Sequence, residues 1–369
     1  MITITKACQG ELTYPFPCTR KELLFFDIET TGFSAKTSAL YLIGALYYNE
    51  NHWEIIQWFA DDYESEKDLL FSFFTFLKKF SFLVHFNGNG FDIPFLMKKC
   101  QQHELTDTNY TFNKIHSYDI YKMIYPHRKR LNIENMKQKT LEAFLHISRE
   151  DTYTGGELIA FYQKFLKIKE TQPDRAKELQ HFLLLHNQDD LAGMLQFSNI
   201  LFLADLLSGN ITFSTLSATK TDAAIQFTGT LPFHLDATFS AQTEDFLLSL
   251  KENMLTLAVS TCHATLKYFY DNYKDYFYLP KEDTAIHKSV ATYVDKEFRQ
   301  KAKKENCYIK KEGHFLPSYS TQLKPVFRTD YASKEYFILL DDASLQSNAL
   351  LNEYINSFLR ENKQLLLCS

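Results

Sequence analysis

The chain has 369 residues, of which 45% are hydrophobic and 15% aromatic, so it can bury a large core and is long enough for two domains. Its formal charge of −5 excludes the strongly basic composition common in nucleic-acid-binding domains, although a local basic patch and metal-binding carboxylates are compatible with an acidic total. No run approaches the roughly 20 apolar residues of a membrane span or forms a signal-peptide core, and the six cysteines show no CxxC pair. We therefore expect a cytoplasmic protein with reduced thiols and no membrane contact.

The first half of the chain alternates strand-like and helical segments. Three strand-like runs, a helix, a short buried strand and a second helix are predicted in this order at 23–29, 39–48, 52–60, 64–80, 82–86 and 91–100. A short strand leading into a helix that Pro126 ends is expected at 113–126, and helical stretches at 139–147, 155–168 and 174–207. This order indicates an α/β domain with a mixed sheet flanked by helices.

The pattern changes after about residue 205. Short runs that alternate apolar and polar residues, broken by Gly, Pro and Asn, follow at 209–217, 223–241, 246–273 and 335–342. We place a boundary near residue 207. The prediction is an N-terminal domain of residues 1–206, with its core at 20–205, and a β-rich α+β accessory domain of residues 207–369.

Acidic residues occur at the edges of several apolar segments. Asp27 and Glu29 end the run "LLFFDIE", and their spacing on a strand directs both side chains to one face. Asp92 follows a buried strand and the turn "NGNG", and "HNQDD" places His186, Asp189 and Asp190 within an apolar helix. Carboxylates in apolar surroundings are costly unless they are paired or bind a cation. A shared site for hard divalent cations, which prefer oxygen ligands, would satisfy all of them.

Three of these segments resemble sequence motifs of one enzyme superfamily. "FDIETTGF" is similar to the first motif of the DEDD exonucleases, "FNGNGFDIPFL" to the second and "HNQDD" to the third. The segments "HSYDIYKMI" and "KTLEAFLHISREDTYTGGELIAFYQKFL" resemble the YprB-like ribonuclease H-like proteins within that superfamily. The resemblance covers residues 20–205 and implies a ribonuclease H-like fold.

The resemblance also implies roles for individual residues. Asp27, Glu29, Asp92 and Asp190 would hold two Mg²⁺ or Mn²⁺ ions, and His186 would assist deprotonation of the attacking water. The superfamily has either Tyr with three intervening residues before the last Asp or His with four, whereas this chain has His with three. Asp189 is thus a rival to Asp190, although residues 186 and 190 share one face of a helix.

Other polar residues allow two interpretations each. Asp119 is expected to cap a helix. The basic run 126–139 is either a solvated loop or a phosphate-contacting segment. Residues 281–311 hold nine Lys or Arg against five Asp or Glu among aromatic residues, which is typical of a surface for single strands or of an amphipathic helix over 289–305.

These features predict a 3′-to-5′ exonuclease that acts on single-stranded ends of DNA or RNA and releases nucleoside 5′-monophosphates. The metal chemistry acts on the phosphate, which both nucleic acids share, so DNA and RNA both remain candidate substrates. The alternative is a non-catalytic ribonuclease H-like protein that binds nucleic acid or a protein partner. An endonuclease for structured substrates is a lesser alternative.

Overall fold

The computed structural model describes residues 1–105, 112–131, 133–221, 223–320, 323–339, 341 and 343–362. The chain divides into two compact units, the first of residues 1–129 and 133–204 and the second formed mainly by residues from 205 onward. Within the described residues, no single helix is long and apolar enough to span a membrane. The helices α8 (Pro173–Phe197) and α9 (Ile200–Leu207), which meet at a bend of 44°, pass this test of length and composition together.

The first unit is built on a six-stranded mixed sheet with the strand order β1-β4-β3-β2-β5-β6. Its strands are β1 (Ile2–Cys8), β2 (Leu23–Thr30), β3 (Leu40–Asn49), β4 (His52–Phe59), β5 (Phe82–His85) and β6 (His116–Asp119). The pairs β1-β4, β4-β3 and β3-β2 are antiparallel, and the pairs β2-β5 and β5-β6 are parallel. The mixed sheet of an α/β unit confirms the predicted fold class.

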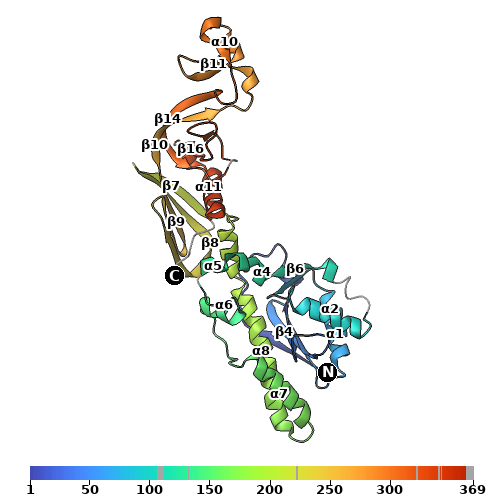
Figure 1. Cartoon of the computed structure of the whole chain (residues 1–369). Helices are drawn as coiled ribbons and strands as arrows, with labels where there is room; N and C mark the ends of the chain where they lie inside the picture. The colour runs from blue at the N-terminus through green and yellow to red at the C-terminus, as the bar shows by residue number, and fades with distance from the viewer. Residues whose placement is uncertain are drawn as a thin grey trace. The chain divides into compact units, whose positions relative to one another are not determined.

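Helices cover both faces of this sheet (Figure 1). They are α1 (Glu66–Leu77), α2 (Asp92–Gln102), α4 (Ile120–Ile124), α5 (Arg128–Leu131), α6 (Gln138–Phe144), α7 (Gly155–Ile168), α8 (Pro173–Phe197) and α9 (Ile200–Leu207). On one face, Phe26 of β2 stacks on Phe73 of α1, with ring centroids 5.5 Å apart. Helix α8 packs against β2 and β3 on the opposite face. Successive residues of a strand alternate between faces, so Asp27 and Glu29 point toward α8.

Two local features of the sheet bear on the sequence analysis. Glu50 and Asn51 have φ of 43° and 76° and connect β3 to β4 in a hairpin. Strand β1 was not among the expected elements, although the alternation in "ITIT" is typical of a strand. Among the described strands it pairs with β4 alone and forms an edge of the sheet.

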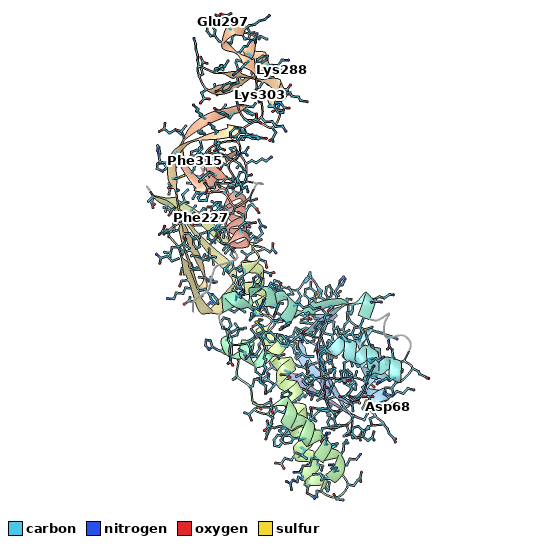
Figure 2. All side chains as sticks on the ribbon, in the orientation of Figure 1. Asp68, Phe227, Lys288, Glu297, Lys303 and Phe315 are labelled. Carbon is cyan, nitrogen blue, oxygen red and sulfur yellow. The ribbon has the colours of Figure 1, made fainter. Side chains whose placement is uncertain are left out.

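The second unit is β-rich, as expected, and its described residues form three small sheets. Their strands are β7 (Thr215–Lys220), β8 (Ala224–Gln242), β9 (Phe246–Ser260), β10 (Cys262–Phe269), β11 (Tyr276–Leu279), β12 (Thr284–His287), β13 (Gln300–Lys301), β14 (Tyr308–Pro317), β15 (Val326–Phe327) and β16 (Phe337–Leu339). The sheet orders are β7-β8-β9, β10-β14-β16-β15 and β12-β11-β13. Phe227 stacks on Tyr354 of α11 (Asn348–Glu361), and Phe315 packs against Phe327 (Figure 2).

The amphipathic helix predicted over 289–305 is wrong. Only α10 (Lys288–Ala291) and a 3-10 turn at Lys296–Phe298 are helical there, and β13 follows. Pairing of β13 with β11 and burial of Ala302 hold the segment extended. Arg299 supports the fold by bonding the carbonyl of Ala291 and lying 5.0 Å from the ring centre of Phe277. The alternative of a surface for single strands stays a prediction.

Candidate active site

The predicted site residues come from three elements of the first unit. Asp27 and Glu29 lie on β2, and Asp92 is the first residue of α2. His186 and Asp190 lie one turn apart on α8. Because β2 directs its polar face toward α8, the strand and helix together bring these side chains to one place.

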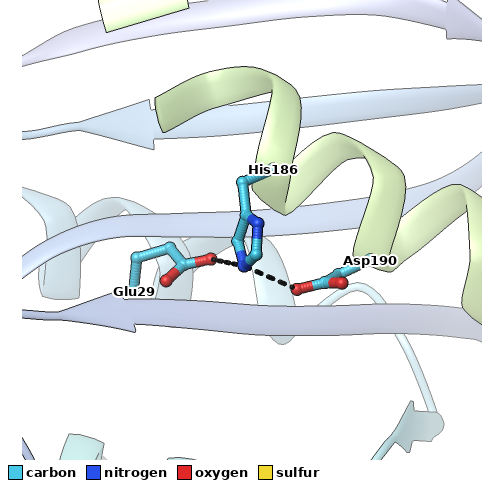
Figure 3. Close-up of side chains that lie close together, drawn as sticks. All are labelled: Glu29, His186 and Asp190. Atoms are coloured by element: carbon cyan, nitrogen blue, oxygen red, sulfur yellow. Dashed lines mark ion pairs between the residues drawn. The ribbon is translucent and has the colours of Figure 1, made fainter. Parts of the chain in front are cut away.

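Glu29, His186 and Asp190 form the most compact part of the site (Figure 3). His186 Nε2 lies 3.7 Å from Glu29 Oε1 and 3.5 Å from Asp190 Oδ2. One ligand atom from each of the three residues lies within 4.8 Å of the other two, which is close enough for them to share one ion. The three residues thus offer two carboxylates and one imidazole to a cation.

The remaining two carboxylates, Asp27 and Asp92, interact electrostatically with this group. Loss of hydration raises the pKa of Asp27 well above its ordinary value, and the charges of Asp190, Glu29 and Asp92 raise it further. Glu29 shows the same direction, first from loss of hydration and then from Asp190 and Asp92. Burial raises the pKa of Asp92 to about 7, although backbone N–H groups partly oppose it. The four carboxylates therefore repel one another when they are ionised.

The turn before α2 places Asp92. Asn87 has a φ of 58°, and the Asp119 carboxylate accepts hydrogen bonds from the backbone N–H groups of Asn87 and Asn89 at 3.0 and 3.2 Å. Asp119 also accepts the N–H of Lys122 at 3.2 Å, which confirms its predicted role as a helix cap. One carboxylate thus fixes both α4 and the turn that leads into Asp92.

The two acidic residues of "HNQDD" have different surroundings. Asp190 faces Glu29 and His186, whereas the Asp189 carboxylate accepts the backbone N–H groups of Glu150 and Asp151 at 2.8 and 2.7 Å. The structure therefore brings Asp190, and not Asp189, into the carboxylate group. Asp189 instead holds the segment before α7.

That segment supplies two residues that the sequence analysis missed. Arg149 Nη2 lies 2.7 Å from Asp190 Oδ1, and Arg149 Nη1 lies 2.8 Å from Glu142 Oε2. Asp151 Oδ2 lies 2.6 Å from His186 Nδ1. The stretch "SREDTY" has no periodicity or motif that would have singled out either residue.

The basic run 126–139 contributes to internal contacts. Lys139 Nζ lies 3.0 Å from Asp151 Oδ2 and donates to the carbonyl of Tyr153 at 2.8 Å. Arg128 lies over the ring of Tyr125, with 4.1 Å from its guanidinium carbon to the ring centre. Lys139 is thus part of the support for His186, a role that neither interpretation of the run included.

The donor set fits a hard divalent cation. Such ions prefer carboxylate oxygens, and a bound cation would offset both the lost hydration and the neighbouring negative charges that raise the pKa values of Asp27, Glu29 and Asp92. Arg149 supplies one positive charge at Asp190, whereas the four carboxylates carry four negative charges when they are all ionised. The arrangement is therefore compatible with bound Mg²⁺ or Mn²⁺.

Comparison with known proteins relates the first unit to one superfamily. A model of the RNase_H superfamily matches residues 24–201 of the chain. No curated protein matches the chain. The YprB-like subtype stays a prediction.

Solved structures that share similarity with the chain include a DNA polymerase and exonucleases. The family B DNA polymerase of Pyrobaculum calidifontis is 16% identical with a TM-score of 0.39, and the match covers 56% of this chain and 30% of the polymerase. Exonuclease I of E. coli, solved with single-stranded DNA, is 12% identical with a TM-score of 0.28 and coverages of 62% and 54%. Exonuclease I from Methylocaldum szegediense is also 12% identical, with a TM-score of 0.29 and the same coverages. The chain thus spans about half or less of these proteins.

Proposed function

We propose that this protein is a divalent-metal-dependent nuclease that removes nucleotides from the 3′ ends of single-stranded DNA or RNA. The observation that carries the proposal is the convergence of four mutually repelling carboxylates beside His186 within an RNase_H superfamily domain. Such a cluster is costly for a protein unless cations bind there. The exonuclease direction and the single-stranded substrate follow from the motif resemblance.

The chain supplies the ligands and the proton acceptor. Asp27, Glu29, Asp92 and Asp190 would hold two Mg²⁺ or Mn²⁺ ions. When bound, such ions stabilise negative charge on the reacting phosphate and on the leaving 3′ oxygen. His186 Nε2 faces the same space as Glu29 and Asp190, so it can accept a proton from a water held there. The product would be a nucleoside 5′-monophosphate.

One observation favours the non-catalytic alternative. The ion pair of 2.7 Å between Arg149 and Asp190 gives one carboxylate an internal partner, as expected for a protein that binds nucleic acid or a partner without metal. The other three carboxylates oppose this reading, because burial and then the neighbouring carboxylates, Asp190 included, raise their pKa values in the presence of the ion pair.

The deciding experiment is degradation of 5′-labelled single-stranded DNA and RNA in Mg²⁺, Mn²⁺ or EDTA. We expect a ladder of shortened products that requires metal and disappears in Asp27→Ala. The matched control is Asp174→Asn, which changes an exposed carboxylate in the first turn of the same helix α8 and should keep full activity.

Each outcome selects one function. Metal-dependent shortening lost in Asp27→Ala supports the exonuclease, and cleavage of a circular single strand would indicate an endonuclease instead. No cleavage of either nucleic acid, with no Mn²⁺ binding by calorimetry, would favour the non-catalytic binding protein.

A further inference from the structure

The two ring nitrogens of His186 contact different carboxylates. Nδ1 lies 2.6 Å from Oδ2 of Asp151, on the side away from the metal-binding group. Nε2 lies 3.7 and 3.5 Å from Glu29 and Asp190. The ring therefore bridges a supporting carboxylate and the group in which chemistry is proposed.

The groups around Asp151 favour the ionised form of its carboxyl group. Its side chain is completely buried, yet Lys139 Nζ lies 3.0 Å and Arg149 Nη2 3.6 Å from its Oδ2. The backbone N–H of Tyr153 donates to its Oδ1 at 3.0 Å. An ionised carboxylate can only accept hydrogen bonds, so Nδ1 of His186 must be the donor at 2.6 Å.

Asp189 ties the Asp151 segment to the helix that carries His186. Its Oδ2 accepts the backbone N–H groups of Glu150 and Asp151. Asp189 and His186 both lie on α8. Through Asp189 the helix therefore holds the segment that contains Asp151, and Asp151 in turn orients His186 of the same helix. This closed arrangement gives Asp189 a task distinct from that of Asp190.

We propose that Asp151 is a positioning residue that keeps the proton of neutral His186 on Nδ1 and leaves Nε2 free as an acceptor, and that Asp189 holds Asp151 in place. The proposal rests on the nuclease function proposed above. In the step it supports, Nε2 takes a proton from water while the water oxygen bonds to phosphorus and the bond from phosphorus to the 3′ oxygen breaks. The leaving oxygen takes a proton from solvent, and Asp151 balances the charge of the doubly protonated ring.

The decisive variant is Asp151→Asn, which keeps the size of the side chain. An amide can turn its NH₂ toward Nδ1, and the ring proton must then move to Nε2, which can no longer accept. We expect kcat to fall about 10²- to 10⁴-fold, the range seen when a general base loses its orientation. KM and the Mn²⁺ affinity measured by calorimetry should stay within about threefold, because Asp151 contacts neither proposed substrate nor metal.

Two further variants complete the test. Glu157→Gln is the matched control, because it changes an exposed carboxylate that caps α7 only six residues away and should leave kcat unchanged. Asp189→Ala removes the anchor of the segment and should lower kcat in the same direction as Asp151→Asn. Thermal unfolding of each variant checks the fold, and Asp189→Ala serves as the test if Asp151→Asn does not fold.

Nitrogen NMR of the histidine rings gives a readout that does not depend on cleavage. With His186→Gln used to assign the signal, wild type should show a protonated Nδ1 and an unprotonated Nε2, and Asp151→Asn should show the reverse. A protonated Nε2 in neutral wild-type His186, or wild-type kcat in Asp151→Asn, would overturn the proposal. If wild type shows the expected ring state but cleaves no nucleic acid, the nuclease function fails and the Asp151 orientation of His186 is supported.

Discussion

The amide nitrogen of Asn187 on α8 donates a hydrogen bond of 2.9 Å to Oδ2 of Asp27 on β2. The amide oxygen of Asn187 accepts from Gln57 Nε2, also at 2.9 Å. Asn187 is fully buried and sits directly above Gly44, the residue of β3 that pairs with Asp27. The helix can approach the strand this closely only because residue 44 has no side chain.

Gly44→Ala should therefore disturb the site. A Cβ at this position would lie 2.8 Å from Leu191 Cδ1 and would overlap the Asn187 amide. We expect a loss of about 2 kcal/mol of stability, typical of overpacking, together with reduced activity because Asp27 loses its partner. Urea unfolding and the cleavage assay measure both effects.

Gly156→Ala is the control for this substitution. Gly156 lies in the first turn of α7, and a Cβ there meets nothing within 4 Å. Alanine favours a helix, so stability should be unchanged or rise by up to about 1 kcal/mol. Equal effects of the two substitutions would show that the Asn187 contact does not depend on Gly44.

The ion pair between Arg149 and Asp190 predicts a second stability effect. Arg149→Gln removes a largely buried cation from Asp190 and Glu142 and leaves both carboxylates without it. Loss of one partner of a buried pair costs about 3 kcal/mol. We expect this loss in urea unfolding with EDTA, and a smaller one with Mg²⁺, because bound cations would offset the charge of Asp190.

Arg128→Gln is the comparison variant, because Arg128 stacks on Tyr125 and donates a hydrogen bond to its carbonyl, away from the carboxylate group. Its unfolding should be nearly unchanged in both conditions. The same loss for Arg149→Gln with and without Mg²⁺ would argue against a metal at Asp190.

The sequence predicted the N-terminal elements well because their signals are local. Apolar runs in β2 and β5, and helical spacing in α1 and α8, determine these elements with little help from distant contacts. The segment 289–305 has helical spacing of charges but forms a turn and β13, because pairing with β11 outweighs its intrinsic preference. Tertiary contacts therefore explain this error.

The same distinction holds within the candidate site. Asp27, Glu29, Asp92 and Asp190 stand out in the sequence as acids beside apolar runs. Arg149 and Asp151 do not stand out in the sequence. They reach Asp190 and His186 because the chain turns back toward α8 after α6, and only the folded structure shows this. Separation of Asp189 from Asp190 likewise required the backbone contacts of residues 150 and 151.

We predict that the side chain of Phe33 contacts the substrate. Its side chain is 93% exposed, although it lies four residues after Glu29 and its ring contacts that of Phe91, the neighbour of Asp92, at 6.2 Å. An exposed ring beside a nuclease site can stack on a base, an interaction of about 1–3 kcal/mol. Phe33→Ala should raise KM for single-stranded oligonucleotides about tenfold and change kcat little.

Phe71→Ala provides the comparison for Phe33. Phe71 is 64% exposed on α1 and comes from no segment of the site. Its replacement should leave KM unchanged. An unchanged KM in Phe33→Ala as well would remove Phe33 from the proposed substrate contacts.

The raised pKa values predict how the stability of the metal-free protein depends on pH. The pKa of Asp92 is about 7 in the folded protein against an ordinary value of 3.8, so between these values the folded state binds more protons than the unfolded state. Stability from this group is complete below pH 3.8 and is lost as the pH rises through 7. Asp27 and Glu29 act in the same direction. Each pKa unit corresponds to about 1.4 kcal/mol, so the loss should reach a few kcal/mol.

Urea unfolding in EDTA at several pH values between about 5 and 8.5 measures this loss, with Asp92→Asn as the variant that separates Asp92 from all other groups. Asp92→Asn cannot ionise, so its stability should decline less with pH and should exceed that of wild type at the alkaline end. Addition of Mg²⁺ there should stabilise wild type more than the variant, since binding to the folded state alone raises stability. Parallel pH curves for the two proteins would mean that Asp92 is ionised in the folded protein without metal, and the carboxylate repulsion inferred for the site would then be wrong.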